Sequence, residues 1–259
     1  MPADARTICV ENLEIIATPD GSQTLRDPAS GITYRSTYGA RTEARHVFVE
    51  GTRLFTQPGP HRVLELGLGG GTNFLETLCV RAEKAPNAEL IYHAIERAPI
   101  APNLARQLHQ AEDPARAAAL TILTRALAHF HQTRATRVEH HEASLGVTLV
   151  VHCGEWRSVT LQETFDAIYH DPFDPQVNEE AWTKACFGWV AEHMTDQALL
   201  TTYSAAGAVR RNLAAAGLYT GWRPGAGGKR EMTAAAKSRD ALSGYQLCST
   251  SKQPPGFEP

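Results

Sequence analysis

Cysteine is scarce and irregularly placed in this sequence. The five cysteines are odd in number, lie far apart and include no Cys-x-x-Cys pair: Cys9, Cys79, Cys153, Cys186 and Cys248. This pattern favours neither a disulfide framework nor a zinc ribbon, and it is typical of reduced thiols. Long apolar runs are also missing, and the first twenty residues carry Asp4, Arg6, Glu11 and Glu14 where a signal peptide would be apolar. We therefore expect a soluble, cytoplasmic protein with no membrane partner.

Neither sign of charge is in large excess. Lys and Arg total 25 against 28 Asp and Glu, so the formal net charge is −3. This balance gives no overall field for nucleic acid, although a local basic patch can still exist. A composition of 42% hydrophobic residues with 20 Gly and 15 Pro excludes collagen, coiled-coil arrays and wholesale disorder. The sequence therefore describes a globular protein.

Strand and helix patterns alternate from residue 61 onward, which predicts a doubly wound α/β sheet with mostly parallel strands. Strands are expected over 63–66, 90–95, 147–152, 165–170 and 198–203, and helices over 101–130, 179–194 and 206–216. Two further extended segments are expected over 218–222 and 232–237. Before residue 61, the Asp20-Gly21 pair between two apolar runs predicts a β-hairpin, followed by a short helix within 39–54. We divide the chain into an N-terminal extension (1–58), a Rossmann-like domain (59–240) and a C-terminal tail (241–259).

Three glycines follow the first strand of the alternation directly. Gly67, Gly69 and Gly71 allow a tight turn that brings a ligand against the N-terminus of the next helix. Their spacing differs from the dinucleotide pattern Gly-x-Gly-x-x-Gly, and Glu65 lies just before them. A carboxylate would repel a pyrophosphate but attract the sulfonium of S-adenosylmethionine. A purely structural turn is the alternative.

Acidic residues end two further strands. Glu96 could accept both hydroxyls of a ribose, and Glu155 could accept a hydrogen bond from an adenine amino group. NAD would use an acid at position 96 equally well, so Glu96 indicates a nucleoside without choosing between ligands. Each acid alone could be a solvated loop carboxylate, but three acids at successive strand ends form a stronger signal.

The segment Asp171-Pro172-Phe173-Asp174-Pro175 follows another strand. Its two prolines fix a rigid corner that would present Asp171 and Phe173 at the carboxyl edge of the sheet. A target base could stack on Phe173. An amine must be neutral to accept a methyl group, although an alkylammonium has a pKa of about 10.4. Asp171 could orient such an amine, pass its proton outward or stabilise charge.

Histidines and basic pairs offer further candidates. His129, His131 and the run His140-His141-Glu142 lie in polar, poorly patterned stretches, and we expect no metal site there. The pairs Arg210-Arg211 and Lys229-Arg230 lie near glycines or turns and are the best candidates for phosphate contacts. Solvated surface is the alternative for both pairs.

Ordered motifs along residues 13–235 resemble one family. They are Thr18-x-Asp20-Gly21-Ser22, Tyr34-x-Ser36-x-x-Gly39-Ala40, Glu65-x-Gly67-x-Gly69-x-Gly71-x-Asn73, Asp171-x-Phe173-x-Pro175-x-x-Asn178 and Gly227-Gly228-Lys229-Arg230-Glu231. They resemble the MnmD family of tRNA wobble-uridine methyltransferases, which also form the methyltransferase half of bifunctional MnmC.

The resemblance implies a class I methyltransferase fold with S-adenosylmethionine as cofactor and tRNA as partner. The implied reaction converts a 5-aminomethyl group of the wobble uridine to 5-methylaminomethyl-(2-thio)uridine, with Asp171 at the catalytic centre. The implied cofactor-binding residues are Glu65, Gly67, Gly69, Gly71, Asn73, Glu96, Arg97, Glu155, Asp171 and Pro172. The implied substrate-binding residues are Tyr34, Ser36, Phe173, Arg210, Arg211, Lys229 and Arg230.

Some positions depart from the family pattern. Asp174 stands where the family has a small residue, and Glu179 stands where it has proline. Their added charge keeps two alternatives open: a methyltransferase for another nucleoside or a small amine, and a non-catalytic nucleotide-binding module. A flavin-binding glycine fingerprint is missing, so we expect a stand-alone methyltransferase with an independent FAD-dependent oxidase acting upstream.

Overall fold

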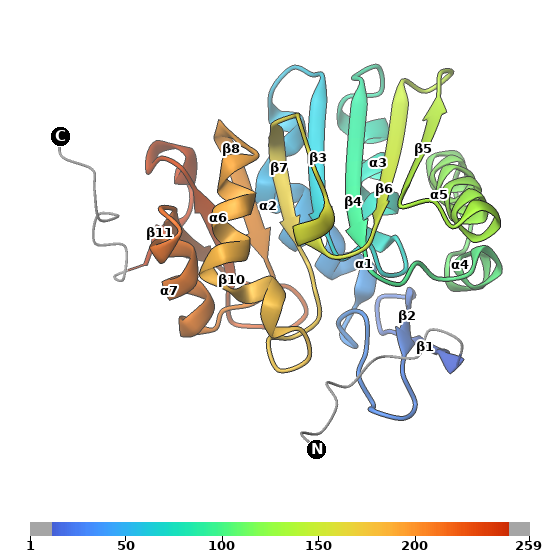
Figure 1. Cartoon of the computed structure of the whole chain (residues 1–259), viewed down its shortest axis with the longest axis horizontal. Helices are drawn as coiled ribbons and strands as arrows, with labels where there is room; N and C mark the ends of the chain where they lie inside the picture. Colours follow the sequence, from blue (N-terminus) through green and yellow to red (C-terminus); the bar gives the residue numbers. More distant parts are fainter. Residues whose placement is uncertain (1–11, 249–259) are drawn as a thin grey trace.

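A mixed, mostly parallel sheet organises the part of the chain that the computed structural model describes, residues 12–248 (Figure 1). Its nine strands lie in the order β11-β9-β10-β8-β7-β3-β4-β6-β5. The parallel strands are β3 (His61–Leu66), β4 (Leu90–Glu96), β6 (Val147–Cys153), β7 (Phe165–His170) and β8 (Met194–Thr202). The antiparallel pairings bring in β5 (Arg137–Glu142), β9 (Tyr219–Arg223), β10 (Met232–Ala236) and β11 (Gln246–Leu247).

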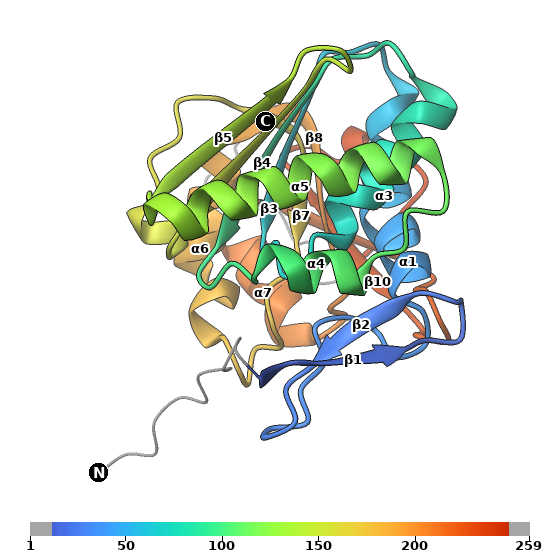
Figure 2. The same cartoon turned by 90° about the vertical axis from the view of Figure 1, so that its right-hand side faces the viewer.

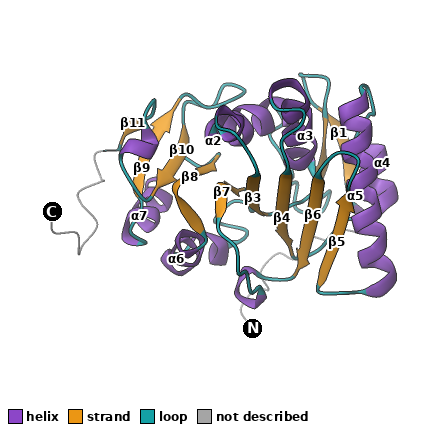
Figure 3. Cartoon of the chain, turned by 90° about the horizontal axis from the view of Figure 1, so that it is seen from above, coloured by secondary structure: helices purple, strands orange, loops and turns teal. Residues whose placement is uncertain are grey.

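Helices cover both faces of this sheet (Figure 3). One face packs against α3 (Thr72–Lys84), α5 (Pro114–Thr133) and the helical segment formed by α1 (Ala40–Glu43), η2 (Ala44–Val49) and α2 (Glu50–Thr52), and α4 (Pro102–Leu108) packs on α5. The other face packs against α6 (Lys184–Glu192) and α7 (Gly207–Ala215). Successive strand residues therefore enter different cores: Val63 belongs to the first and Leu64 to the second. Burial on both faces explains why the central strands read as continuous apolar runs.

The sheet reverses its direction of growth at β3. From β3 the chain proceeds to β4 and β6 on one side, and then returns to β7 and β8 on the other. Ligands of doubly wound sheets bind at such a reversal, beyond the carboxyl ends of the strands. The fold therefore places the crevice of this protein at the ends of β3, β4 and β7. The doubly wound α/β architecture expected from the sequence is confirmed.

Several expected elements differ in the structure. The helix expected over 101–130 is two helices: α4 ends at Leu108, where His109 is extended, and α5 begins at Pro114 behind the N-cap Asp113. The polar run around His140 and His141 is the edge strand β5, whose exposed side chains hide its pattern. The helix expected over 179–194 is confined to η5 (Glu179–Trp182) and α6.

The expected C-terminal tail starts too early. Ala241 and Leu242 are buried in η6 (Asp240–Leu242), and β11 pairs with β9, so residues 241–247 belong to the sheet unit. Residues 249–259, like Cys9, lie outside the described residues. None of the helices between residues 12 and 248 is long and apolar enough to cross a membrane.

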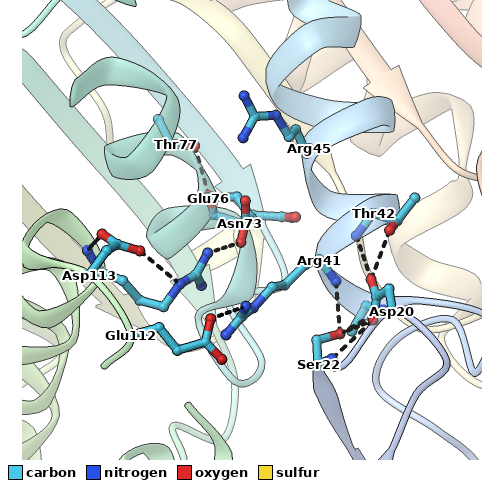
Figure 4. A network of polar contacts seen from close by, with 12 residues as sticks. Asp20, Ser22, Arg41, Thr42, Arg45, Asn73, Glu76, Thr77, Glu112 and Asp113 are labelled. Carbon is cyan, nitrogen blue, oxygen red and sulfur yellow. Dashed lines mark hydrogen bonds and ion pairs between the residues drawn. The ribbon is translucent and has the colours of Figure 1, made fainter. Parts of the chain in front are cut away.

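The N-terminal hairpin lies beside the carboxyl edge of the sheet (Figures 1 and 2). Its strands β1 (Glu14–Ala17) and β2 (Gln23–Arg26) pair antiparallel around Asp20-Gly21, as expected. Asp20 then joins the turn to α1, because its carboxylate accepts hydrogen bonds from Thr18, from Ser22 and from the backbone N–H of Thr42 (Figure 4). These hydrogen bonds hold the pKa of Asp20 below its ordinary value against the opposing effect of burial.

We expect Asp20→Asn to lower the free energy of unfolding at pH 7 by about 1 kcal/mol, since hydrogen bonds to the carboxylate weaken. A depressed folded-state pKa means that the unfolded state binds the proton more readily. The contribution is therefore present above the ordinary pKa of 3.8 and is lost as the pH falls below it. Urea unfolding at pH 7 and pH 3 measures this, with the exposed Asp196→Asn as control. An equal difference at both pH values would contradict it.

Candidate functional site

A cavity opens at the carboxyl edge, where β3, β4, β6 and β7 end. It encloses about 1030 Å³ with its open mouth included, which is enough for a nucleoside-sized ligand. Its walls combine the glycine loop, the ends of β4 and β6, the corner after β7, and the segment after the hairpin. The lining residues include Tyr34, Arg35, Gly67, Gly69, Glu96, Arg97, Glu155, Asp171, Pro172 and Phe173.

The three glycines of the loop have different tasks. Gly67 has a φ of 92°, and a Cβ there would lie 2.6 Å from the carbonyl oxygen of Asp171. Gly69 has a φ of 52° and lines the cavity, and its N–H donates a hydrogen bond of 2.8 Å to Glu96. Gly71 lies outside the cavity lining, and a Cβ there would meet Leu123 of α5 at 2.4 Å. Of these three, Gly67 and Gly69 bring the backbone to the cavity, and Gly70 beside them lines it as well.

The acids at the ends of β4 and β6 both line the cavity. Glu96 accepts hydrogen bonds from the N–H groups of Gly69 and Ala98, each 2.8 Å long, so its carboxylate is fixed against the glycine loop. Glu155 forms an ion pair of 3.2 Å with Arg97, and both side chains are about half exposed. Glu96 is thus a rigid acceptor, whereas the Arg97–Glu155 pair forms a solvated rim.

Behind the loop lies a buried polar network. Arg35 forms an ion pair with Asp171 and lies 3.6 Å from Glu65. Asn73 donates to Glu65 at 2.7 Å and to Asp171 at 2.9 Å, and Tyr92 donates to Glu65 at 2.8 Å. Burial raises the pKa of Glu65 to about 7, although Arg35 and both hydrogen bonds oppose the shift.

This network changes the expected roles of two residues. Glu65 and Asn73 are fully buried and do not line the cavity, so Glu65 lies beneath the site rather than facing a ligand. The argument that Glu65 attracts a sulfonium by direct contact is therefore wrong for this geometry. Asp171, whose carboxylate shares Asn73 with Glu65, does line the cavity.

Arg35 is the site residue that the sequence interpretation missed. It occupies an unspecified position between Tyr34 and Ser36 of the quoted motif, and nothing in its local pattern distinguishes it from a solvated arginine. In the structure its side chain is only 6% exposed. The one available signal is its position within a segment whose neighbours on both sides were expected to bind substrate.

Two aromatic side chains line the cavity beside the glycine loop. The rings of Tyr34 and Phe173 meet edge to face, with their centroids 4.8 Å apart. The corner that carries Phe173 is held from two sides, because Trp182 donates to the carbonyl oxygen of Phe173 and Tyr203 donates to that of Pro172. Burial raises the pKa of Tyr34 well above its usual range, so its hydroxyl stays protonated.

The remaining expected substrate contacts lie outside the cavity lining. Ser36 donates its N–H to Glu43, and Lys229 forms an ion pair of 2.5 Å with the same buried carboxylate while lying over the ring of Tyr203. Arg210 is bound by Glu231 at 2.7 Å.

Two basic side chains remain on the surface. Arg211 and Arg230 are exposed, and within residues 12–248 neither forms an ion pair. Each expected basic pair therefore contains one residue engaged within the protein and one that is accessible.

The histidines expected to bind no metal have other contacts. His131 lies 3.1 Å from the carbonyl oxygen of Ile100, and His141 lies 2.9 Å from the hydroxyl of Thr148. Over the described part of the chain, no group of three or more His, Cys, Asp or Glu side chains is arranged to hold a metal ion.

We expect Gly69→Ala to weaken the binding of S-adenosylhomocysteine by roughly tenfold or more, equivalent to about 1.4 kcal/mol. The added methyl group would lie 3.1 Å from the ring of Tyr34, between the loop and any ligand, and a left-handed φ strains alanine. Isothermal titration calorimetry measures the affinity.

The matched control is Gly217→Ala, which shares a positive φ of 88° but would meet no atom within 4 Å and lies outside the cavity lining. It should lose stability through backbone strain and keep its affinity. Equal affinities for the wild type and Gly69→Ala would show that the glycine loop is not part of the binding site.

Comparisons with known proteins agree with this architecture. A family model described as S-adenosyl-L-methionine-dependent methyltransferase matches residues 118–238. The crystal structure of MNMC2 from Aquifex aeolicus superposes with a TM-score of 0.72 at 24% identity, covering 90% of this chain and 75% of that one. That likeness shows the fold.

Curated relatives extend the match along the sequence. The tRNA 5-methylaminomethyl-2-thiouridine biosynthesis bifunctional protein MnmC of Cupriavidus metallidurans is 32% identical over 238 residues, covering 88% of this chain and 34% of its own length. The protein of the same name from Magnetococcus marinus is 34% identical over 209 residues, covering 77% of this chain and 30% of its own length. The chain thus spans about a third of the length of the curated relatives it matches. The family model and these relatives together support an MnmC methyltransferase-domain family for this chain.

Proposed function

We propose that this chain transfers a methyl group from S-adenosylmethionine to the 5-aminomethyl group of the wobble uridine in tRNA. The observation that carries the proposal is the junction of two half-sites in one cavity. Gly69 and Glu96 form a nucleoside half, and Asp171 and Phe173 form an acceptor half. The relatives named above take part in 5-methylaminomethyl-2-thiouridine biosynthesis, which is the corresponding chemistry.

The residues present fit the cofactor. Gly67 and Gly69 line the cavity with backbone that packs too closely on Asp171 and Tyr34 for a Cβ, and Glu96 would provide a fixed acceptor for ribose hydroxyls at the neighbouring strand end. Arg97, Glu155 and Pro172 would complete the binding surface. S-adenosylmethionine, when bound, supplies an electrophilic methyl group on a sulfonium.

The acceptor half would hold and orient the uridine. Phe173 and Tyr34 offer ring surface for the base, and base stacking on aromatic side chains typically contributes about 1–3 kcal/mol. Asp171 lies beside this wall, where it would orient the aminomethyl nitrogen and conduct its proton toward solvent. The exposed Arg211 and Arg230 would contact tRNA phosphates.

Asp171→Asn should lower the turnover number by about 10²–10⁴-fold, since an amide cannot accept the proton of the amine as a carboxylate can. The assay is methyl transfer to tRNA that carries the unmethylated aminomethyl group, at saturating donor, with nucleosides identified by mass spectrometry. The free energy of unfolding should also fall, by up to roughly 3–5 kcal/mol. This is the loss typical of removing one partner of a buried ion pair, because Arg35 keeps its charge. Turnover is therefore compared at a temperature where both proteins are folded.

Asp166→Asn is the control, because Asp166 begins the same strand β7 at the end away from the cavity and accepts the N–H of Arg62. Wild-type turnover in Asp171→Asn would show that Asp171 does not accept the proton of the amine. A wild-type protein that leaves this tRNA unmethylated would overturn the proposed function.

Arg230→Glu should weaken tRNA binding and reduce its salt dependence by about one unit in slope if Arg230 contacts a phosphate. Filter binding over a series of salt concentrations measures this. The matched variant is Lys229→Met, which breaks the ion pair with Glu43 and should mainly lower stability. An equal salt slope for Arg230→Glu and the wild type would show that Arg230 is a solvated surface residue that does not contact a tRNA phosphate.

A further inference from the structure

Arg35 is a buried cation at the wall of the cavity. Its guanidinium contacts Asp171, lies 3.6 Å from Glu65 and stands 5.6 Å from the ring centre of Phe48. Its backbone N–H donates a hydrogen bond of 2.9 Å to the hydroxyl of Thr24 in β2. The hairpin therefore positions Arg35, and it is the N-terminal extension that places this charge in the site.

The charge of the acceptor half depends on this one guanidinium. Titratable groups of two kinds surround Arg35 on the elements packed against it. The acids are Glu43 on α1, Glu65 on β3, Glu96 on β4 and Asp171 after β7. The other groups are Tyr34, Tyr92 on β4, His109 after α4, Tyr169 on β7 and Tyr203 after β8. Burial raises the pKa of all four tyrosines and lowers that of His109 to about 4, so these groups are neutral at pH 7. Glu43 is bound by Lys229, and Glu96 faces the nucleoside half.

Three groups therefore decide the local charge: Arg35, Asp171 and Glu65. Burial raises the pKa of Glu65 to about 7, so it is only partly ionised at neutral pH. Arg35 is the one cation among these three groups, and its guanidinium pairs directly with Asp171. Without Arg35, an uncompensated carboxylate would face the incoming amine.

The sign of this charge matters for the acceptor. An alkylammonium has no lone pair, and a bare carboxylate would stabilise that form and raise its pKa. A paired carboxylate gives it no such stabilisation. The neutral amine can form the new N–C bond with its lone pair while the S–C bond of the donor breaks and that electron pair returns to sulfur. The methylated nitrogen then gives up one proton to solvent.

We propose that Arg35 sets the charge of the acceptor half so that the amine is bound as the free base rather than as the ammonium ion. Arg35 is thus a positioning residue that acts through Asp171. This inference rests on the proposed function for its substrate. Its electrostatic part concerns only the cavity and can be measured without turnover.

The first test is the pH profile of kcat for methyl transfer at saturating donor and tRNA, which reports the groups that titrate in the enzyme–substrate complex. Arg35→Gln should move the acidic limb of the profile upward by about one pH unit, because the ammonium form is now favoured. Arg35→Lys keeps the charge and should move the limb less. The control is Arg26→Gln, an exposed arginine of the same extension that forms an ion pair with Glu14. An unmoved limb in Arg35→Gln would overturn the inference.

The second test is binding by calorimetry, using S-adenosylmethionine and S-adenosylhomocysteine as probes. They differ by one methyl group and one positive charge, so the ratio of their affinities reports the local charge. Arg35→Gln should raise the preference for S-adenosylmethionine by roughly three- to tenfold. Asp171→Asn should lower the preference for S-adenosylmethionine, since the charge of Arg35 then has no partner in Asp171. This variant provides the test if Arg35→Gln does not fold.

The two tests separate the inference from the proposed function. Unchanged affinity ratios in both variants would overturn the role of Arg35, whatever the substrate is. Shifted ratios combined with no methyl transfer by the wild type would retain the charge effect and overturn the proposed function.

Discussion

The ion pair between Arg35 and Asp171 is the constraint on which the site depends. Moving either charge out of water is costly, and a buried pair is stable only if further hydrogen bonds satisfy it. Asn73 supplies one to Asp171, and Glu65 stands within 3.6 Å of the arginine. The pair joins the N-terminal extension to the end of β7, so the extension completes the cavity instead of merely covering it.

The contacts of the extension all serve this placement. Asp20 fixes the hairpin turn to α1, Thr24 holds the backbone of Arg35, and Glu43 ties the following loop to Lys229. Tyr203, under Lys229, then holds the corner that carries Phe173 through the carbonyl of Pro172. Segments from both ends of the described chain are thereby locked around the carboxyl edge of the sheet. We infer that acceptor geometry and extension stability are linked.

Local sequence patterns were sufficient where the constraint was local. Gly67 and Gly69 predict a close approach of the backbone to a ligand. Glu96 ends an apolar run whose strand end can be placed from the sequence. The hairpin turn at Asp20-Gly21 and the corner at Asp171 were predictable for the same reason. Arg35 was not predictable, because its burial follows from a contact with Asp171, which lies 136 positions later in the chain. The burial of Glu65 and the engagement of Lys229 by Glu43 are also long-range facts.

The most direct measurement of the central claim is a crystal structure of the protein with S-adenosylhomocysteine. The account predicts the ribose hydroxyls on Glu96, the amino acid part along Gly67 and Gly69, and the sulfur facing Asp171 with Arg35 still paired to it. S-adenosylhomocysteine bound outside this cavity, or a complex in which Arg35 has turned away from Asp171, would contradict it.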